Sequence, residues 1–396
     1  MMTSDRPGGG NAERQRPLRI AYAVHGYGRG HATRSLAMLS ELASRHEVRV
    51  LAGGDAYAAM SGSLPVMRIP TLGFAYGRGT GARSNWDTMR HNAGAVLDMV
   101  CHGAVFEMVC AALREFEPDV VISDAEAWSH LAAQRLDIPR IAFDHIGILA
   151  HCRPAIDPGD RLEALFDAFV YRSLMGTADR VLVSSFFPAP PRSPQVRVVP
   201  TLARPAVREA QASEGEHLLL YLNQGSHQFD ERLRRVFIEL GRPVRIYGTP
   251  LRGRDSCLEF LPAGDLSFVQ DLASCQAVIS TAGNQLVGEA MLLGKPLLVM
   301  PERCVEQRMN ARAVAELGIG LRVEQRLLAI SHLRELLARR LAFVARMREL
   351  RRDGLSEALA TIETFIGELV AARLRSAGER RGAGPALLAG RRPVMP

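Results

Sequence analysis

The alternation of short apolar runs with helical patterns is the feature that most constrains the fold of this chain. An apolar run over 18–24 leads into a glycine-rich stretch, a helical pattern and a second apolar run over 48–52. This order predicts a strand, a loop, a helix and another strand. Further runs at 120–123 and 141–143 flank a predicted helix over 125–136. Strands that alternate with helices in this way form a parallel sheet covered by helices.

The same alternation begins again in the second half of the chain. Four more strands are predicted at 218–222, 244–248, 277–280 and 296–300. Before them, segment 188–216 is rich in proline, arginine and short polar pieces, which is typical of a connection between domains. With 396 residues, of which 47% are hydrophobic, the chain is long enough for two domains with separate cores. We therefore predict an α/β protein with two doubly wound, Rossmann-like domains that face a central cleft.

The two ends of the chain differ from these domains. The N-terminal residues are polar and charged and lack the apolar core of a signal peptide, so they are predicted to form a disordered leader. Helical patterns from 331 to about 375 close the second domain, and the basic stretch after them is predicted to be disordered. The predicted boundaries are 1–17 for the leader, 18–200 for the N-terminal domain, 201–372 for the C-terminal domain and 373–396 for the basic tail.

The net charge and the cysteine spacing limit which classes of partner and which cellular compartment we expect for this chain. The formal charge of +7 favours anionic partners, such as nucleic acid, acidic lipid or a sugar nucleotide. Nearly all the basic residues are arginines and many lie in the C-terminal tail, so we expect a solvated tail and no nucleic-acid partner. The six cysteines form no Cys-x-x-Cys pair, which favours a reducing cytoplasm over a disulfide framework or a zinc site. No apolar run approaches the ~20 residues that span a bilayer, so we expect any membrane contact to be peripheral.

The first glycine-rich loop, HGYGRGH at 25–31, joins a predicted strand to a predicted helix. Gly28 and Gly30 let the backbone approach a ligand closely, and a helix start favours an anion. A dinucleotide fingerprint would need its third glycine at the position of His31. Asp55 lies where a ribose-binding acid of such a site is expected, but the glycine spacing disfavours an NAD site.

His31 is also a candidate general base. It opens a helix, where the helix dipole favours a neutral imidazole that accepts a proton. Asp124 follows another predicted strand of the same sheet, and the carboxyl ends of parallel strands meet at one edge, so we expect Asp124 to orient His31. The sequence leaves a structural alternative open: His31 caps or packs its own helix, and Asp124 caps the helix that begins at Ala125.

The second loop, STAGNQ at 280–285, again lies between a strand and a helix. Small residues and backbone N–H groups at a helix start suit a diphosphate. Glu289 lies more than one turn into that helix, where its carboxylate could bind both hydroxyls of a ribose. Polar groups suited to a sugar follow the next strand, and they are Glu306, Gln307 and Asn310.

These segments resemble a known family. The segment STAGNQLVGEAMLLGKPLLVMPERCVEQRMNA resembles the donor-binding region of inverting GT-B glycosyltransferases. That group contains the UDP-glucuronosyltransferases, the plant UDP-glycosyltransferases and the bacterial transferase that adds N-acetylglucosamine to a lipid-linked precursor. The segment GYGRGHATRS resembles the glycine-rich loop and histidine of the same group, and most of all its bacterial and archaeal branch with a Gly-His-Ala-Thr-Arg-Ser signature. The resemblance covers roughly residues 18–370 and implies the GT-B fold.

The resemblance also implies roles for individual residues. His31 would deprotonate the acceptor hydroxyl, with Asp124 as its partner. The implied donor-binding residues are Gly225, Ser226, Thr281, Gly283, Asn284, Gln285, Glu289, Glu306 and Gln307. Among these, the resemblance assigns the diphosphate to the loop residues, the ribose to Glu289 and the donor sugar to Glu306 and Gln307. The plant run His-Cys-Gly-Trp-Asn-Ser is replaced here by Ser-Thr-Ala-Gly-Asn-Gln, in which the glycine and the asparagine remain.

The resemblance further indicates the stereochemistry. Many retaining GT-B enzymes carry a second glutamate eight residues before the ribose glutamate, and Thr281 occupies that position here. We therefore expect a single displacement from a nucleotide sugar, with UDP as the commonest nucleotide of the group. Backbone amides and the helix dipole would hold the charge of the leaving diphosphate. The sequence has no Asp-x-Asp run, so we expect no metal and no cofactor besides the nucleotide-sugar co-substrate.

The acceptor is expected to bind the first domain, as a lipid or another small hydrophobic or glycan precursor with a free hydroxyl. The stretch 74–90 holds Arg78, Arg83 and Arg90 among glycines and aromatic residues. It is either a mobile lip that contacts acidic lipid at the inner face of the cell membrane or a plain solvated loop.

Other candidates for the acceptor side follow the predicted strand at 141–143, and they are Asp144, His145 and His151. Two rival functions also stay open. A sugar-nucleotide 2-epimerase would need carboxylates and a histidine around the sugar, and a silent nucleotide-sugar-binding protein would need no base.

Overall fold

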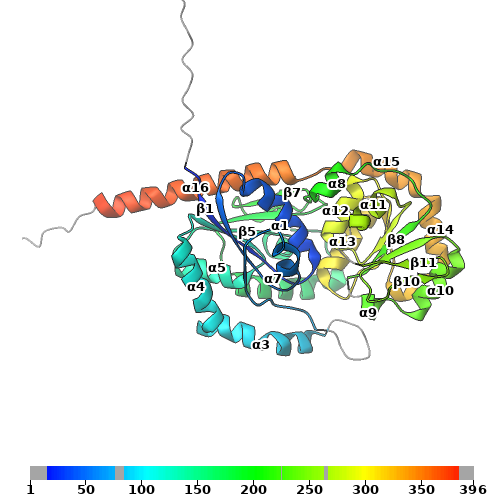
Figure 1. Ribbon diagram of the computed structural model, residues 1–396, viewed down its shortest axis with the longest axis horizontal. Coiled ribbons are helices and arrows are strands. Elements are labelled where there is room, and N and C mark those ends of the chain that lie inside the picture. Colours follow the sequence, from blue (N-terminus) through cyan, green and yellow to red (C-terminus); the bar gives the residue numbers. More distant parts are fainter. Residues whose placement is uncertain (1–15, 76–83, 224, 263–265, 383–396) are drawn as a thin grey trace, which may run out of the picture.

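The computed structural model describes residues 16–75, 84–223, 225–262 and 266–382 and contains two seven-stranded sheets that lie side by side (Figure 1). The strand order is β3-β2-β1-β4-β5-β6-β7 in the first sheet and β10-β11-β9-β8-β12-β13-β14 in the second. Neighbouring strands are parallel except β10 and β11, which pair antiparallel. The predicted α/β fold with two doubly wound domains is confirmed.

The strands of the first sheet are β1 (Arg19–Val24), β2 (Glu47–Ala52), β3 (Val66–Arg68), β4 (Val120–Asp124), β5 (Arg140–Asp144), β6 (Arg180–Ser184) and β7 (Val196–Val199). Those of the second sheet are β8 (Leu218–Tyr221), β9 (Val244–Tyr247), β10 (Gly253–Asp255), β11 (Leu258–Phe260), β12 (Val278–Ser280), β13 (Leu297–Val299) and β14 (Gly320–Arg322). The predicted connection at 188–216 thus contains one strand of the first sheet, β7.

The first sheet is covered by helices on both faces. Helices α4 (Ala104–Phe116), α5 (Ala127–Arg135) and α7 (Arg161–Met175) pack against one face, and α1 (Arg29–Leu42) and α2 (Gly54–Met60) pack against the other. The apolar strand residues that these helices cover, such as Ile20 and Ile122, are fully buried. The remaining helices of this half are α3 (Asn85–Cys101), α6 (Ile148–His151) and the 3-10 turn η1 (Pro158–Asp160).

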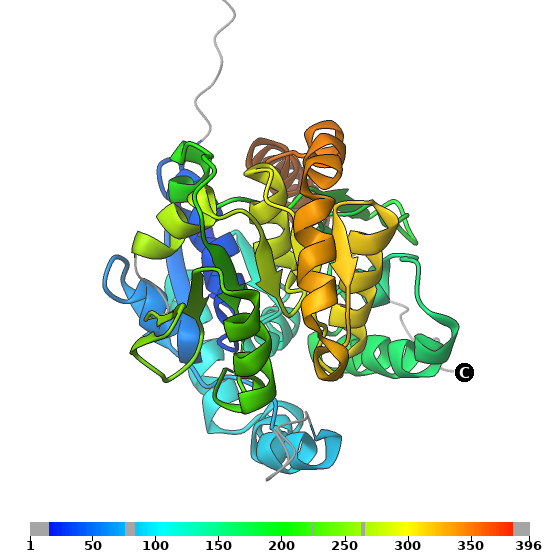
Figure 2. The ribbon, with the colours of Figure 1, turned by 90° about the vertical axis from the view of Figure 1, so that its right-hand side faces the viewer.

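The second sheet is built in the same way, and Figure 2 shows this domain facing the viewer. Helices α8 (Pro205–Glu209), α11 (Leu266–Ser274), α12 (Asn284–Leu292) and α13 (Val305–Glu316) pack against one face. Helices α10 (Glu231–Leu240) and α14 (Ile330–Ala338) pack against the other, while α15 (Arg340–Leu350) contributes to both cores. The short elements are α9 (Gly225–Gln228) and η2 (Gln325–Leu327).

The last helix, α16 (Leu355–Gly382), returns to the first domain (Figure 1). Its apolar stripe, which includes Ile362 and Phe365, packs into the core of the first sheet with α1. The prediction that 201–372 forms the C-terminal domain is therefore wrong at its end, because this stripe does not encode which sheet it covers. The prediction of a disordered tail from 373 is also wrong up to 382, where strong helix formers continue α16. Residues 383–396 lie outside the described part of the chain.

The topology places the candidate site. The strand order reverses between β1 and β4 in the first sheet and between β8 and β12 in the second, and open α/β sheets bind ligands at such switch points. Helix α1 begins at the first switch point and α12 begins at the second. The two helices contact each other, since a Cβ built on Gly30 would lie 3.6 Å from the Cβ of Gln285. The two switch points therefore meet at the junction between the domains.

Candidate active site

The two predicted catalytic residues lie together. His31 is in the first turn of α1 and is partly exposed, whereas Asp124 is the last residue of β4 and is fully buried. The distance between Nδ1 of His31 and Oδ1 of Asp124 is 2.7 Å. The backbone N–H of His25 also bonds to the carbonyl oxygen of Asp124 at 2.9 Å, which ties the ends of β1 and β4 together.

Two residues that sequence reasoning missed complete the surroundings of Asp124. Nε of Arg34 and Oγ of Ser35 donate to Oδ2 of Asp124 at 3.1 and 2.9 Å, and Nη2 of Arg34 donates to Oδ1. Burial alone would raise the pKa of Asp124, but the charges of Arg34 and His31 hold this pKa below its ordinary value. Arg34 and Ser35 lie three and four residues after His31, a spacing that places them on one helix face and could have found them.

The loop before α1 is held in an unusual backbone conformation. Gly28 has φ 82° and its N–H donates to Oδ2 of Asp55 at 3.0 Å. Asp55 thus fixes the glycine-rich loop. Ala125, directly after Asp124, has φ 52°, a conformation that costs a non-glycine residue free energy and is common at functional sites. The ring of His25 lies edge-on to that of His31, with centroids 5.1 Å apart, and burial lowers the pKa of His25 to about 3.

The three candidates for the acceptor side have structural partners. Asp144 accepts the hydroxyl hydrogen bond of Tyr171 at 2.6 Å, and burial raises the pKa of Asp144. His145 crosses to the second domain, because its Nε2 lies 3.1 Å from Oδ1 of Asn310. Burial lowers the pKa of His145 to about 4. His151 packs edge-on against Tyr171, with ring centroids 5.6 Å apart.

The loop between β12 and α12 carries several predicted donor residues. Ala282 has φ 71°, and Gly283 is the N-cap of α12. A Cβ on Gly283 would meet nothing within 4 Å, so the space in front of this helix start is open. Thr281 is buried. The side chain of Asn284 turns to the first domain, where its Nδ2 donates to the carbonyl oxygen of Ser184 at 3.1 Å.

Glu289 does not face the open space. Its carboxylate is fully buried and accepts hydrogen bonds from Nε and Nη2 of Arg204 at 2.9 and 2.8 Å. Gln285 donates to the same carboxylate at 3.1 Å and to the carbonyl oxygen of Leu202 at 2.7 Å. Arg204 is partly exposed, so it lies between solvent and the buried carboxylate of Glu289. Sequence reasoning missed Arg204, which lies 85 residues from Glu289 along the chain.

The remaining donor candidates are spread around this loop. Oε1 of Glu306 accepts from Nδ2 of Asn310 at 2.7 Å, and Gln307 accepts from the backbone N–H of Glu302 at 2.9 Å. Gly225 is buried, and a Cβ there would lie 2.3 Å from the carbonyl oxygen of Gly248, so this position requires glycine. The side chain of Ser226 lies outside the described part of the structure.

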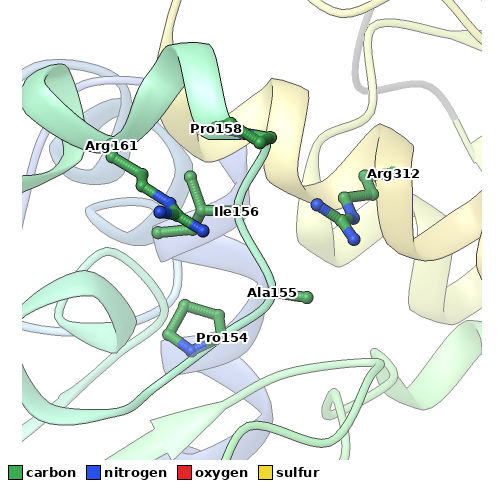
Figure 3. Close-up of a pocket in the computed structure, with 6 residues that line it drawn as sticks. All are labelled: Pro154, Ala155, Ile156, Pro158, Arg161 and Arg312. Atoms are coloured by element: carbon green, nitrogen blue, oxygen red, sulfur yellow. The ribbon is translucent and has the colours of Figure 1, made fainter.

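A separate hollow of about 470 Å³ lies between segment 154–161 of the first domain and α13 of the second. Figure 3 shows Arg161 on one side of segment 154–158 and Arg312 on the other. None of the predicted site residues lines this hollow.

Among the described residues, no group of three or more His, Cys, Asp and Glu side chains is arranged to hold a metal ion. In the same residues no single helix has the length and composition to cross a membrane. Arg78 and Arg83 of the predicted lip lie outside the described residues, and Arg90 is exposed on α3.

Known proteins share both the fold and the sequence pattern of this chain. The chain is similar to the glycotransferase of kitacinnamycin (21% identical, 89% of this chain and 100% of that chain, TM-score 0.61). It is also similar to the glycosyltransferase VinC, solved in complex with dTDP (16% identical, 89% of this chain and 100% of that chain, TM-score 0.58). A third similar structure is MurG of Acinetobacter baumannii (16% identical, 88% of this chain and 100% of that chain, TM-score 0.56). These likenesses show the GT-B fold, and no curated relative matches the sequence. The model of the family described as Glycosyl transferase family 1 matches residues 18–340, which is most of the chain. The chain therefore belongs to glycosyl transferase family 1.

Proposed function

We propose that this protein is an inverting glycosyltransferase that moves a sugar from a nucleotide donor to a hydroxyl acceptor, with His31 as the general base. The observation that carries the proposal is the 2.7 Å contact between His31 and the buried Asp124 at the junction of the two domains. Family membership supports glycosyl transfer from a nucleotide sugar. The inversion, the base and the substrates are the parts that we propose.

The contact with Asp124 fixes how His31 works in this proposal. Nδ1–H donates to Oδ1 of Asp124, which leaves the lone pair of Nε2 to accept a proton. The acceptor oxygen attacks the anomeric carbon as its proton passes to Nε2 of His31. The bond between that carbon and the diphosphate breaks, and the nucleoside diphosphate leaves with the bonding electrons. One displacement of this kind inverts the anomeric configuration.

The donor lies on the second domain in this proposal. The diphosphate occupies the open space in front of α12, where the backbone N–H groups of residues 283–285 and the helix dipole stabilise its negative charge. The absence of a side chain at Gly283 supports this placement, because a ligand can approach the backbone there. Glu289 acts on the ribose through Arg204, which it holds with two hydrogen bonds. Gly225, Ser226, Thr281, Glu306 and Gln307 surround the donor.

The substrates and conditions follow from the same proposal. The donor is UDP-linked, and dTDP-linked sugars are the next choice because VinC was solved with dTDP. The acceptor is a lipid or another small hydrophobic or glycan precursor that binds the first domain in the cytoplasm. Transfer needs no metal ion, because backbone amides take its place at the leaving group.

A panel of UDP-, dTDP- and GDP-sugars with EDTA present tests this proposal. We expect one donor to raise the melting temperature and to release its nucleoside diphosphate slowly, and we expect His31→Ala to abolish release while donor binding persists. Isomerisation of the sugar without release would indicate a sugar-nucleotide 2-epimerase. A raised melting temperature without turnover, with any hydroxyl acceptor offered, would indicate a silent binding protein. No response to any nucleotide sugar would refute the proposal.

A further inference from the structure

Helix α3 presents an apolar face to solvent. Trp86, Met89, Leu97 and Val100 are each more than 60% exposed, and Val100 reaches 72%. Their positions are i, i+3, i+11 and i+14, which places them on one stripe about 21 Å long on an α-helix. An exposed apolar stripe of this kind on one helix face is typical of an interaction site.

The exposed charged side chain beside this stripe is cationic. It is Arg90, which is exposed on α3. The two acidic residues of the helix, Asp87 and Asp98, are only partly exposed. Asp98 is held inward, because its carboxylate accepts hydrogen bonds from backbone N–H groups at the start of α4 and from the indole of Trp128 at 3.0 Å. The outward face of α3 therefore combines apolar side chains with a cationic group and has no fully exposed carboxylate.

The packing of α3 and α4 indicates whether this apolar face can cross a bilayer or only lie on its surface. Neither helix alone is long and apolar enough to span a bilayer. The two together have the length and composition of a span, but they are bent by 52°. Helix α4 cannot leave the protein, because Phe106, Val109 and Leu113 are buried in the core of the first domain. In Figure 1, α3 runs along the lower edge of the first domain with one side uncovered. This arrangement suits a helix that lies on a membrane surface and does not cross it.

We propose that α3 docks the protein on an acidic lipid surface. The helix lies parallel to the bilayer, Trp86, Leu97 and Val100 enter the headgroup region, and Arg90 contacts anionic headgroups. A second copy of the chain is the alternative occupant of this face, and light scattering without vesicles distinguishes it from lipid. The proposal depends on the exposure and charge of α3 and is independent of the glycosyl-transfer chemistry.

The chain contains its own reporter for this contact. It has two tryptophans, of which Trp86 is 68% exposed on α3 and Trp128 is 2% exposed in the core. We expect vesicles of phosphatidylglycerol and phosphatidylcholine to shift the fluorescence of the full chain to shorter wavelength. Vesicles of phosphatidylcholine alone should have a smaller effect, and high salt should reduce the shift. Trp86→Phe should remove the shift while the protein still sediments with acidic vesicles. Absence of both the shift and sedimentation at low salt would overturn the proposal.

A pair of charge variants tests whether α3 is the contact. Leu97→Glu combined with Val100→Glu should weaken vesicle binding about tenfold or more, because both apolar side chains lose their burial. Leu341→Glu combined with Leu374→Glu is the matched control, since it adds the same two charges at leucines that are each 68% exposed on α15 and α16, and it should bind as the unmodified chain does. The melting temperature of each variant checks its folding. Equal loss in both variants would overturn the proposal. So would a dimer, seen by light scattering without vesicles, that the α3 variant alone abolishes.

Discussion

The two loop edges that meet at the domain junction are built from different chemistry. The edge of the first sheet carries ionisable side chains in contact with one another, among them His25, His31, Arg34 and Asp124. The facing loop of the second sheet, 280–285, has no ionisable side chain. The ion pair of Arg204 with Glu289 contacts this loop through Gln285, whose Nε2 donates to the carboxylate of Glu289. In the proposed mechanism, proton transfer takes place at the first edge and the charge of the diphosphate is bound at the second, and variants on each edge test this division.

The largest effect is expected on the first edge. His31→Ala should lower kcat/KM by about 10²–10⁴-fold, which is the usual contribution of a general base. Donor binding should stay the same, because no donor group is assigned to His31. Initial rates of nucleoside diphosphate release, together with calorimetric titration of the donor, would measure both quantities.

His332→Ala is the control for this variant, because His332 lies on α14, where its Nδ1 accepts a hydrogen bond from the backbone N–H of Ala329, and it is not assigned to the reaction. It should retain transfer. If His31→Ala lost donor binding and kept its rate at saturating donor, the division between the two edges would be refuted.

The second prediction concerns the ion pair of Arg204 with Glu289 in the second domain. Arg204→Ala should lower the free energy of unfolding by about 3–5 kcal/mol, because it leaves the carboxylate of Glu289 buried without its charged partner. Urea unfolding at pH 7.5 would measure the loss. Arg204→Met combined with Glu289→Leu should recover most of it, because the variant leaves no unpaired charge in the core.

Arg234→Ala serves as the control in the same domain. Its ion pair with Asp255, at 2.6 Å, is exposed to solvent, so the loss should be much smaller than for Arg204→Ala. Equal losses for Arg204→Ala and Arg234→Ala would mean that the buried pair contributes no more than a surface pair.

The sequence predicts the two edges unequally well. The approach of His31 to Asp124 follows from topology, since both residues stand where neighbouring parallel strands end. Arg34 and Ser35 could have been added from their spacing after His31 on the same helix. In contrast, the pairing of Arg204 with Glu289 joins segments 85 residues apart, and no local pattern connects them.

The overall fold was predictable for a similar reason. Two series of apolar runs determine two parallel sheets, because each strand must be buried on both faces. The return of α16 to the first sheet was not predictable, since an apolar helical stripe fits either core. The sequence pattern of the second loop also could not show that the side chain of Asn284 bonds to the first domain.

The third prediction uses pH to test the buried histidines of the first domain. Burial lowers the pKa of His25 and of His130 to about 3, and that of His145 to about 4, and all three lie in the first domain. Because these pKa values are lower in the folded state, the unfolded chain binds more protons below pH 6.5. The contribution of these histidines to the free energy of unfolding is fully present above pH 6.5. As the pH falls from 6.5 towards 4, the free energy of unfolding decreases by about 1.4 kcal/mol per pH unit for each histidine.

His130→Leu gives the matched test of this prediction. In the described structure neither ring nitrogen of His130 has a hydrogen-bond partner, so an apolar residue costs little at neutral pH. Urea unfolding would measure the decrease in the free energy of unfolding between pH 7.5 and pH 5. This decrease should be about 2 kcal/mol smaller for the variant than for the unmodified chain. An unchanged pH dependence would contradict the assignment of His130 as a buried neutral group.

The fourth prediction compares two glycines of the second domain. Gly283→Ala should leave the melting temperature unchanged, because the new methyl group meets nothing within 4 Å. It should weaken donor binding about tenfold if the diphosphate lies against that backbone. Gly225→Ala should lower the melting temperature instead, because its Cβ would lie 2.3 Å from the carbonyl oxygen of Gly248. Unchanged donor affinity in Gly283→Ala would move the diphosphate away from the start of α12.

The smallest effect is expected where the two domains are held together by charge. Acidic residues of the first domain pair with arginines of the second, in the pairs Asp157–Arg312, Asp157–Arg322, Asp160–Arg308 and Glu163–Arg308. Arg308 bonds two of these carboxylates, at 3.0 and 2.6 Å, but all the partners remain partly exposed. Arg308→Ala should therefore lower the free energy of unfolding by at most about 1 kcal/mol.

Arg308→Ala nevertheless tests whether the two edges must approach each other for the reaction. Its pairs join the domains, whereas the pair of Arg339 with Glu335 at 2.7 Å lies within α14. If approach of the edges limits turnover, Arg308→Ala should change the KM for the donor and make it less dependent on salt, because two of the four pairs that salt screens are then lost. Arg339→Ala, with a similar loss of one exposed pair, should leave the KM unaltered. Equal behaviour of the two variants would mean that the edges act independently of these ion pairs, and the two chemistries would then be joined only by the substrates that bridge them.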